Sequence, residues 1–206
     1  MLEVTDLSIG FGPGECLLEG VSFRVEAGGV LALLGPSGSG KSTVLDWLTG
    51  TLAPGIQARG QLHLNGRDLS GVPTEQRGLG LVLQDGSLFP HMSVADNLRF
   101  GAREPLNAQA MDALLNQADL GGMADRDPAT LSGGQRARVS LLRTLVSQPQ
   151  AVLLDEPFAK LDAELRDQIR AFTWQHTDAV PRVLVTHDAQ DIPPGAQRIQ
   201  LGDAAC

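Results

Sequence analysis

Glycine, serine and lysine gather in the segment GPSGSGKST (35–43), a pattern that is typical of a phosphate-binding loop. The continuously apolar run VLALL (30–34) precedes it and indicates a buried strand, and TVLDWLTG (43–50) follows and indicates a helix. A phosphate-binding loop requires this strand before it and this helix after it. The alternative is a glycine-rich turn without a ligand, which the flanking strand and helix disfavour.

Each residue type in this loop has a physical role in holding a nucleoside triphosphate. Gly35, Gly38 and Gly40 let backbone amides wrap the β- and γ-phosphates without Cβ clashes. Lys41 neutralises the phosphate charge, and the Ser42 hydroxyl ligates Mg²⁺. The sequence therefore predicts an ATP site that contains the residues Gly35, Pro36, Ser37, Gly38, Ser39, Gly40, Lys41, Ser42 and Thr43.

Two neighbouring carboxylates follow a second apolar run, in the segment AVLLDEP (151–157). At the end of a buried strand, Asp155 can reach the Mg²⁺ shell through water. Glu156 can polarise the attacking water as a general base, which typically contributes about 10²- to 10⁴-fold to a rate. A solvated acidic turn would be the preferred interpretation of this pair alone. Together with a phosphate-binding loop, the pair predicts the second half of the ATP site.

A histidine and a glutamine also follow apolar runs, at His187 in VLVTHD and Gln84 in LVLQD. The carboxyl ends of strands form the edge at which α/β folds place their ligands. We therefore expect His187 to contact the γ-phosphate and Gln84 to reach Mg²⁺ or the attacking water. A structural histidine and a surface glutamine are the alternatives. With Glu156, these two residues complete the predicted catalytic set.

The segment TLSGGQRARVSLLRTL (130–145) places two glycines where a helix should begin. Ser132 is a good helix N-cap, yet Gly133 and Gly134 follow it, and each glycine costs about 1 kcal/mol against alanine inside a helix. Glycine also lets a ligand approach bare amides closely, and the usual ligand of a helix N-terminus is an anion. The segment thus predicts a second anion contact, far along the chain from the phosphate loop.

The bulk properties restrict the class of protein. The 206 residues fit one large or two small domains, and a net charge of −8 disfavours a broad nucleic-acid-binding surface. No apolar run approaches the roughly 20 residues of a membrane helix. The N-terminus carries acids and no basic segment, which argues against a secretory signal. We expect a soluble, cytoplasmic protein.

The hydrophobic patterns indicate an α/β fold. Alternating and continuous apolar runs predict strands before residue 35 and again around 78–83, 151–154 and 182–186. The segment GQLHLNGRDL (60–69) reads as a hairpin. Helical spacing dominates between about 85 and 148, so a mostly helical insertion interrupts the α/β core.

Taken together, these segments resemble the ATP-binding subunits of ABC transporters, over nearly the whole chain and in the family's order. The stretch 84–98 looks like that of import ATPases, and the stretches 126–149 and 185–193 are similar to one uncharacterised group of importers. The resemblance implies a P-loop NTPase core, with a mixed sheet flanked by helices, an antiparallel β subdomain and an inserted helical subdomain. It implies one ABC ATPase domain over 1–206, with the helical signature subdomain at about 85–148.

The resemblance also implies a site that two copies share. In the family, two ATPase domains face head to tail, and the signature of one closes on the nucleotide of the other. The signature residues would therefore meet the partner's γ-phosphate; they are Ser132, Gly133, Gly134 and Gln135. ATP and Mg²⁺ are the implied cofactors, and a second copy of the chain is the implied partner.

Two positions depart from the family's usual pattern. The family often stacks a tyrosine on adenine, but this chain has no tyrosine, so Phe11 is the candidate. A hairpin hydrophobe is the alternative role for Phe11. The loop after Glu156 usually reads Ser-Ala-Leu-Asp and here reads AKLD (159–162), so Lys160 adds a charge at the expected seam between the copies.

The implied function is ATP hydrolysis that powers solute transport, with import favoured, through separate permease subunits. The ATPase would lie peripherally on the cytoplasmic face of the inner membrane and serve a permease with an extracytoplasmic solute-binding protein, without nucleic acid. Leu88, Phe89 and Met92 are candidates for a permease docking groove; packing inside the domain is their alternative. Two rival functions are a soluble ABC-type ATPase in nucleic-acid or translation processes and an ATP-binding regulator without turnover.

Overall fold

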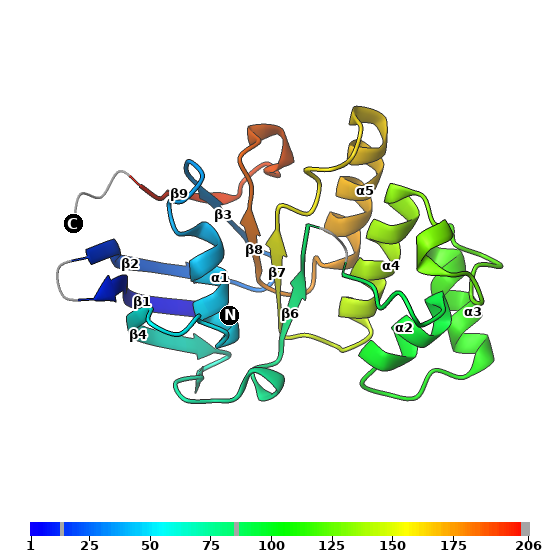
Figure 1. Ribbon diagram of the computed structural model, residues 1–206, viewed down its shortest axis with the longest axis horizontal. Helices are drawn as coiled ribbons and strands as arrows, with labels where there is room; N and C mark the ends of the chain where they lie inside the picture. The colour runs from blue at the N-terminus through cyan, green and yellow to red at the C-terminus, as the bar shows by residue number, and fades with distance from the viewer. Residues whose placement is uncertain (13–14, 85–86, 203–206) are drawn as a thin grey trace. The chain divides into compact units, whose positions relative to one another are not determined.

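The computed structural model describes residues 1–12, 15–84 and 87–202, which form two compact units. The first unit contains Met1–Leu79, Gln150–Asp155 and the chain from Asp178 onward. The second unit contains Gly80–Pro149 and Glu156–Thr177, so it includes the segment 85–148 of the predicted helical subdomain and adds a later helix. Figure 1 follows the chain through both units.

An antiparallel sheet in the first unit has the strand order β2-β1-β4-β5. Its strands are β1 (Leu2–Gly12), β2 (Glu15–Val25), β4 (Gln57–Leu64) and β5 (Arg67–Asp68). The alternating pattern of β1 buries one side of the strand, and Leu2, Val4, Leu7 and Ile9 are at most 2% exposed. Leu64 pairs with Arg67 across Asn65 and Gly66, both at positive φ, which confirms the predicted hairpin.

In the first unit, parallel pairs connect β7 to β8, β8 to β3 and β3 to β9, in the order β7-β8-β3-β9. These strands are β3 (Val30–Leu34), β7 (Ala151–Asp155), β8 (Arg182–Val185) and β9 (Gln197–Gln200). The runs that form β3, β7 and β8 are apolar throughout or nearly so because neighbours cover both faces of these strands. Helix α1 (Lys41–Thr49) connects to β3 through the phosphate loop, and the Arg77 guanidinium donates to carbonyls at its carboxyl end.

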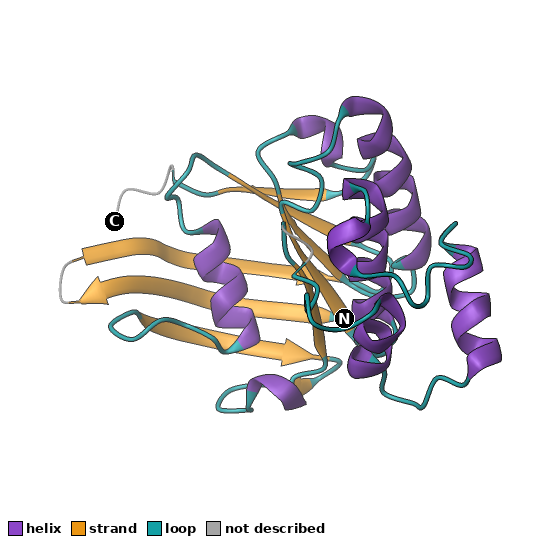
Figure 2. Cartoon of the chain, turned by 45° about the vertical axis from the view of Figure 1, so that its right-hand side comes forward, coloured by secondary structure: helices purple, strands orange, loops and turns teal. Residues whose placement is uncertain are grey.

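The regular secondary structure of the second unit is mainly α-helical, and Figure 2 draws the helices in purple. They are α2 (Val94–Gly101), α3 (Ala108–Gln117), α4 (Gly133–Leu145) and α5 (Ala163–His176). A core of buried residues, including Val94, Leu98, Leu115, Val139 and Leu142, joins α2, α3 and α4. The strand β6 (Leu79–Val82) leads into this unit.

The α/β fold class is confirmed, and two elements had no separate prediction. Helix α2 begins at an exposed Ser93–Asp96 cap, and only a short apolar set, Val94, Ala95 and Leu98, marks it. Strand β9 reads QRIQ and lies at the edge of the parallel sheet, so its exposed polar residues carry no hydrophobic signal. Within the described residues, no helix combines the length and apolar character needed to cross a bilayer.

Candidate nucleotide site

The phosphate loop turns the chain from β3 directly into the N-terminus of α1. Gly40 is the N-cap residue, with φ 90° and ψ 7°, so α1 has no side-chain cap. The first intrahelical bond of α1 is donated by the Val44 amide to the Gly40 carbonyl, at 2.9 Å. Among the described residues, no backbone hydrogen bond engages the four preceding amides, which belong to Gly40, Lys41, Ser42 and Thr43. This N-terminus can therefore bind an anion through four backbone donors and the helix dipole.

The loop glycines are required for two different reasons. Gly38 adopts φ 84° and has open space where a Cβ would lie, so its backbone conformation is the reason for glycine. Gly35 is also at positive φ, and a Cβ there would lie 2.5 Å from the Leu201 carbonyl oxygen. At Gly40 a Cβ would meet the Leu17 side chain of β2 at 3.0 Å. The loop is thus fixed by packing at its ends and open in its middle.

Lys41 lies under the loop rather than in solvent. Its ammonium donates to the carbonyl oxygens of Gly35 at 2.9 Å and Pro36 at 2.7 Å, and the residue is only 8% exposed. An ammonium has three N–H donors, so these two bonds leave a third for a phosphate oxygen. Pro36, Ser37 and Ser42 are exposed, Thr43 is half-buried, and the buried Ser39 hydroxyl has no hydrogen-bond partner among the described residues.

The register of the parallel sheet brings the predicted phosphate loop, Asp155 and His187 to one edge. Val185 of β8 is paired with Asp155 of β7 on one side and with Leu33 of β3 on the other. The loop follows β3, Asp155 ends β7, and His187 lies two residues after Val185 with an exposed side chain. The first unit thus gathers three of the predicted site elements where parallel strands end.

The donor set at this edge fits Mg²⁺. The Ser42 hydroxyl and the Asp155 carboxylate supply oxygen, the ligand atom that Mg²⁺ prefers. Within the described residues, no group of three or more His, Cys, Asp or Glu side chains could hold a metal by itself. Mg²⁺ usually keeps several waters and uses substrate phosphates as further ligands, so a hydroxyl and one carboxylate suffice for such a site.

Phe11 presents an exposed aromatic surface near the end of β1. Its relative exposure is 53%, which is unusual for a large apolar side chain. The hairpin interior does not cover the ring, so it is accessible to a planar base.

The N-terminus of α4 in the second unit is closed by a capping box. The Ser132 hydroxyl accepts from the Gln135 amide at 3.2 Å, and the Gln135 side-chain oxygen accepts from the Ser132 amide at 3.0 Å. These reciprocal bonds satisfy two of the four amides that a helix start leaves without intrahelical partners. In the described part of the chain, no backbone hydrogen bond engages the remaining two amides, which are those of Gly133 and Gly134.

The two signature glycines have different surroundings. A Cβ on Gly134 would overlap the Leu165 side chain of α5, so close packing of α4 on α5 requires glycine there. A Cβ on Gly133 would meet one atom only, Cδ2 of Leu161, at an ordinary 3.8 Å. Packing therefore explains Gly134 and leaves Gly133, which is exposed, without a structural reason.

Glu156 adopts a backbone conformation that its residue type disfavours. Its φ is 45°, in the left-handed region, and its carbonyl accepts from the Ala159 amide at 3.2 Å. Such conformations cluster at functional sites because the surrounding structure must maintain them. The apolar run before Asp155 gave no signal for this strained turn.

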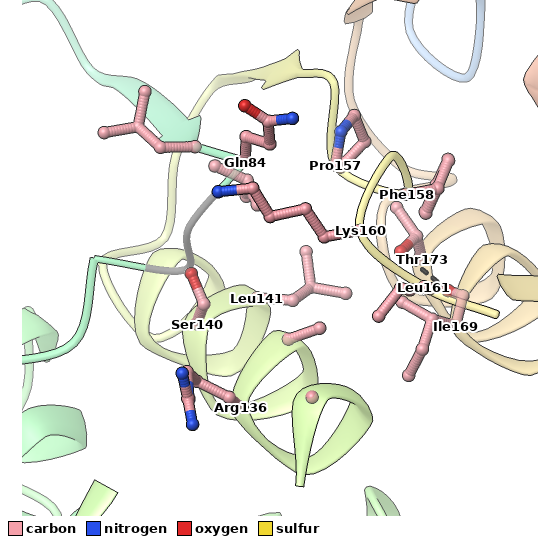
Figure 3. A pocket seen from close by; sticks show the side chains of 14 residues that line it. Gln84, Arg136, Ser140, Leu141, Pro157, Phe158, Lys160, Leu161, Ile169 and Thr173 are labelled. Atoms are coloured by element: carbon pink, nitrogen blue, oxygen red, sulfur yellow. Dashed lines mark hydrogen bonds between the residues drawn. The ribbon is translucent and has the colours of Figure 1, made fainter. Parts of the chain in front are cut away.

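Gln84 and Lys160 line the same cavity of about 110 Å³ in the second unit. Figure 3 shows the Lys160 side chain extending from the 157–161 loop toward the Gln84 side of the cavity. Gly133 and Arg136 of α4 also line it, and Leu141, Phe158 and Ile169 supply an apolar wall. Gly133 of the predicted signature, Gln84 and Lys160 thus border one cavity.

The candidate docking residues belong to a segment that a buried asparagine organises. Asn97 is fully buried; its side-chain oxygen accepts from the Phe89 amide, and its amide group donates to the carbonyls of Phe89, Met92 and Ser93. The Arg143 guanidinium lies 5.1 Å from the Phe89 ring centroid, and burial lowers its pKa. Leu88 packs on the core of the unit. Sequence reasoning missed the roles of Asn97 and Arg143.

The comparisons with known proteins decide the family. A family model described as "ABC transporter" matches residues 18–159, more than half of the chain. The chain belongs to the ABC transporter family. It is an ATP-binding subunit of this family, and it is an ATPase.

Relatives in this ABC family include import proteins. The chain is 45% identical over 207 residues to the "Uncharacterized ABC transporter ATP-binding protein YnjD" of Escherichia coli (strain K12), covering 98% of this chain and 95% of that protein. It is 43% identical over 191 residues to the "Sulfate/thiosulfate import ATP-binding protein CysA" of Mycobacterium tuberculosis (strain ATCC 25618 / H37Rv), covering 89% of this chain and 54% of that protein. The chain thus spans about half the length of CysA.

A solved structure supports the ABC fold. A bacterial Atm1-family ABC exporter with ATP bound matches with a TM-score of 0.80 and 27% identity, over 98% of this chain and 36% of that chain. The resemblance of 126–149 and 185–193 to one uncharacterised group of this family agrees with the YnjD match. Of the predicted nucleotide site, the phosphate loop, Asp155 and His187 lie in the first unit, whereas Gln84, the signature and Glu156 lie in the second.

Proposed function

We propose that two copies of this chain hydrolyse ATP head to tail and power solute import through separate permease subunits. One observation carries the proposal: the capping box of α4 leaves the Gly133 and Gly134 amides for a ligand, and packing gives no reason for Gly133. The chain contains one phosphate loop and one signature segment. A second copy would supply the anion that the signature requires.

The phosphate loop and α1 bind the triphosphate of ATP in this proposal. The four open amides of α1 and the remaining N–H of Lys41 hold the phosphate oxygens. Ser42 and Asp155 hold Mg²⁺, which supplies charge neutralisation for the transferred phosphoryl group. The exposed ring of Phe11 stacks on the adenine, a contact worth about 1 kcal/mol.

Three further residues act on the attacking water and the γ-phosphate. Glu156 accepts a proton from the water as a general base. His187, at the end of β8, donates to a γ-phosphate oxygen, and Gln84 orients the water or completes the Mg²⁺ shell through its amide oxygen. The γ-phosphate then leaves ADP, and the contact that held the two copies is lost.

The signature closes on the partner's nucleotide. The amides of Gly133 and Gly134 donate to its γ-phosphate, and the α4 N-terminus adds about half a positive charge. The exposed Ser132 hydroxyl lies at the same surface. Gln135 keeps Ser132 in place through the capping box, so its contribution is to hold the N-terminus open in this form.

Import and permease docking complete the proposal. The relatives at 39–43% identity are named as sulfate/thiosulfate import proteins, which supports import over export. The segment that contains Leu88, Phe89 and Met92 receives a permease helix, with Phe89 held by Arg143 and Asn97. The ATPase then works at the cytoplasmic face of the inner membrane, with an extracytoplasmic solute-binding protein as a further component.

A pull-down tests the transport assignment. The tagged native chain is solubilised from its own membranes in mild detergent, and the co-purifying proteins are identified. The proposal predicts a polytopic permease, together with or followed by a solute-binding protein. Recovery of ribosomes or DNA, or of no partner, contradicts the importer and the docking segment.

A mixing experiment tests the shared site. A chain with Lys41→Ala lacks a working phosphate loop, and a chain with Ser132→Arg lacks a working signature. The proposal predicts that each variant alone is inactive and that their mixture regains hydrolysis, because a mixed dimer contains one complete site. If both residues served the same chain's nucleotide, the mixture would stay as inactive as its parts.

A further inference from the structure

Thr186 occupies the position between strand β8 and His187, and it is only 2% exposed. Its hydroxyl lies 2.9 Å from the Oδ2 of Asp191 and accepts from the Asp188 amide at 3.1 Å. One side chain therefore links the residue after His187 with a carboxylate five positions along the chain. The two residues that flank His187, Thr186 through its side chain and Asp188 through its amide, therefore belong to this network.

The hydrogen of the Thr186 hydroxyl has a defined direction. A backbone amide can only donate, so the Thr186 hydroxyl accepts from Asp188 and gives its single hydrogen to Oδ2 of Asp191. Its lone pairs are then available for the Asp188 amide, and the two bonds are compatible with each other. Both distances lie within the normal range of protein hydrogen bonds, so Thr186 connects the end of β8 to the turn by two ordinary bonds.

Asp191 is a carboxylate that the local turn does not require. Asp188 is the N-cap of the 3-10 helix Ala189–Asp191. Its carboxylate accepts from the Gln190 amide at 2.9 Å, and its carbonyl accepts from the Asp191 amide at 3.2 Å. Asp191 itself is 2% exposed, and burying a carboxylate is costly unless it is well bonded. Its bond to Thr186 ties the turn back to the end of β8.

We propose that Thr186 and Asp191 are positioning residues for ATP hydrolysis and that they act through His187. They hold the backbone on both sides of His187, so its exposed side chain projects from one fixed point on the edge where β3 and β7 also end. This inference rests on the proposed role of His187 at the γ-phosphate. Hydrogen bonds inside a buried, low-dielectric region are stronger than in water, so these two bonds favour one arrangement of the turn.

The experiment compares steady-state ATP hydrolysis by Thr186→Val and Thr186→Ser. Valine keeps the shape of threonine and removes both hydroxyl bonds, whereas serine keeps the hydroxyl. Since small misplacements of a reacting group can cost up to about 100-fold, we expect kcat to fall about 10- to 100-fold in Thr186→Val, with KM for ATP unchanged. Thr186→Ser retains most of kcat. Asp191→Asn, which keeps an acceptor oxygen, falls between the two.

The same substitutions in a His187→Ala background separate positioning from folding. If Thr186 acts through His187, Thr186→Val causes no further loss of kcat once the imidazole is absent. An equal further loss in that background overturns the inference, as does an unchanged kcat in both Thr186→Val and Asp191→Asn. An unchanged kcat in His187→Ala alone instead refutes the role of His187 in the proposed function, and the inference fails with it. Asp191→Asn serves as the folded test chain if Thr186→Val does not fold.

Discussion

Helices α1 and α4 both have glycine at their N-termini, as the N-cap in α1 and as the first two helical residues in α4, yet they leave different numbers of amides for a ligand. The N-cap of α1 is Gly40, which cannot cap with a side chain, so four amides stay open. The N-cap of α4 is Ser132, whose capping box with Gln135 satisfies two amides and leaves two. The first arrangement suits a site that must hold a whole triphosphate. The second suits a stable helix end that makes one additional contact.

The residues around the two N-termini also make α1 the stronger anion site. Lys41 at α1 is held under the loop by two carbonyls and adds a full charge beside the open amides. The first turn of α4 presents exposed Ser132 and Gly133. The difference shows that the glycine pair of α4 does not form a weaker phosphate loop. The N-terminus of α4 is a capped helix end that keeps two amide donors for a ligand.

The largest expected effect concerns α1. Lys41→Ala removes the only charge among the donors of the phosphate loop, so we expect ATP binding to weaken strongly and hydrolysis to fall by at least about 100-fold. Nucleotide binding by fluorescence titration and phosphate release measure the two effects. Nearly full hydrolysis by Lys41→Ala would show that the N-terminus of α1 is not the main triphosphate site, and would contradict the contrast drawn between α1 and α4.

The next effect concerns α4 and should leave α1 intact. Ser132→Arg places a long side chain where the partner's nucleotide would approach, so we expect hydrolysis to be lost while ATP binding to the single chain is retained. The same titration and phosphate-release assays measure both. Ser132→Arg that still hydrolyses ATP would show that α4 has no part in a shared site.

A smaller effect separates the two signature glycines. Gly133→Ala has space for its Cβ, so we expect unchanged folding or a gain of up to about 1 kcal/mol in unfolding free energy, together with reduced hydrolysis. Gly134→Ala displaces Leu165, so we expect a loss of about 1–3 kcal/mol. Urea denaturation and phosphate release measure both variants. Equal stabilities, or full activity in Gly133→Ala, would contradict the assignment of different roles.

The smallest effect concerns the cap itself. Ser132→Ala removes the hydroxyl that accepts from the Gln135 amide, so we expect the unfolding free energy to fall by about 1 kcal/mol. Gln135→Ala removes the reciprocal bond and should cost no more than this. Urea denaturation measures the free energy of unfolding of each variant, and the unmodified chain and Lys41→Ala serve as references. No loss in either variant would mean that the capping box contributes nothing to α4.

Local patterns in the sequence predicted the parts of the fold that a single segment determines. The apolar runs 30–34 and 151–154 became β3 and β7 because a buried strand must be apolar on both faces. The hairpin at Asn65 and Gly66 formed because both residues tolerate positive φ. The spacing S-x-x-Q at Ser132 also contained the capping box, a signal that could have been used.

Local patterns could not predict contacts between segments that lie far apart in the sequence. Gly133 and Gly134 are neighbours of the same residue type, so the sequence gives no reason to assign them different roles. The difference comes from Leu165 on another helix, which packs against Gly134. Asn97 reads as an ordinary polar residue of a short helix, yet three carbonyls of its neighbours surround it. The bond from Thr186 to Asp191 likewise depends on a turn that no hydrophobic pattern marks.

The central claim is that the α4 signature of one copy closes on the nucleotide at α1 of another. Its most direct test is the solution mass of the Glu156→Gln chain in saturating ATP and Mg²⁺, by sedimentation, with and without Ser132→Arg. Because Glu156→Gln lacks the general base, bound ATP persists. The account predicts twice the mass of one chain for Glu156→Gln and a single-chain mass when Ser132→Arg is added, with ATP still bound. A single-chain mass in both, or a dimer that survives Ser132→Arg, would contradict it.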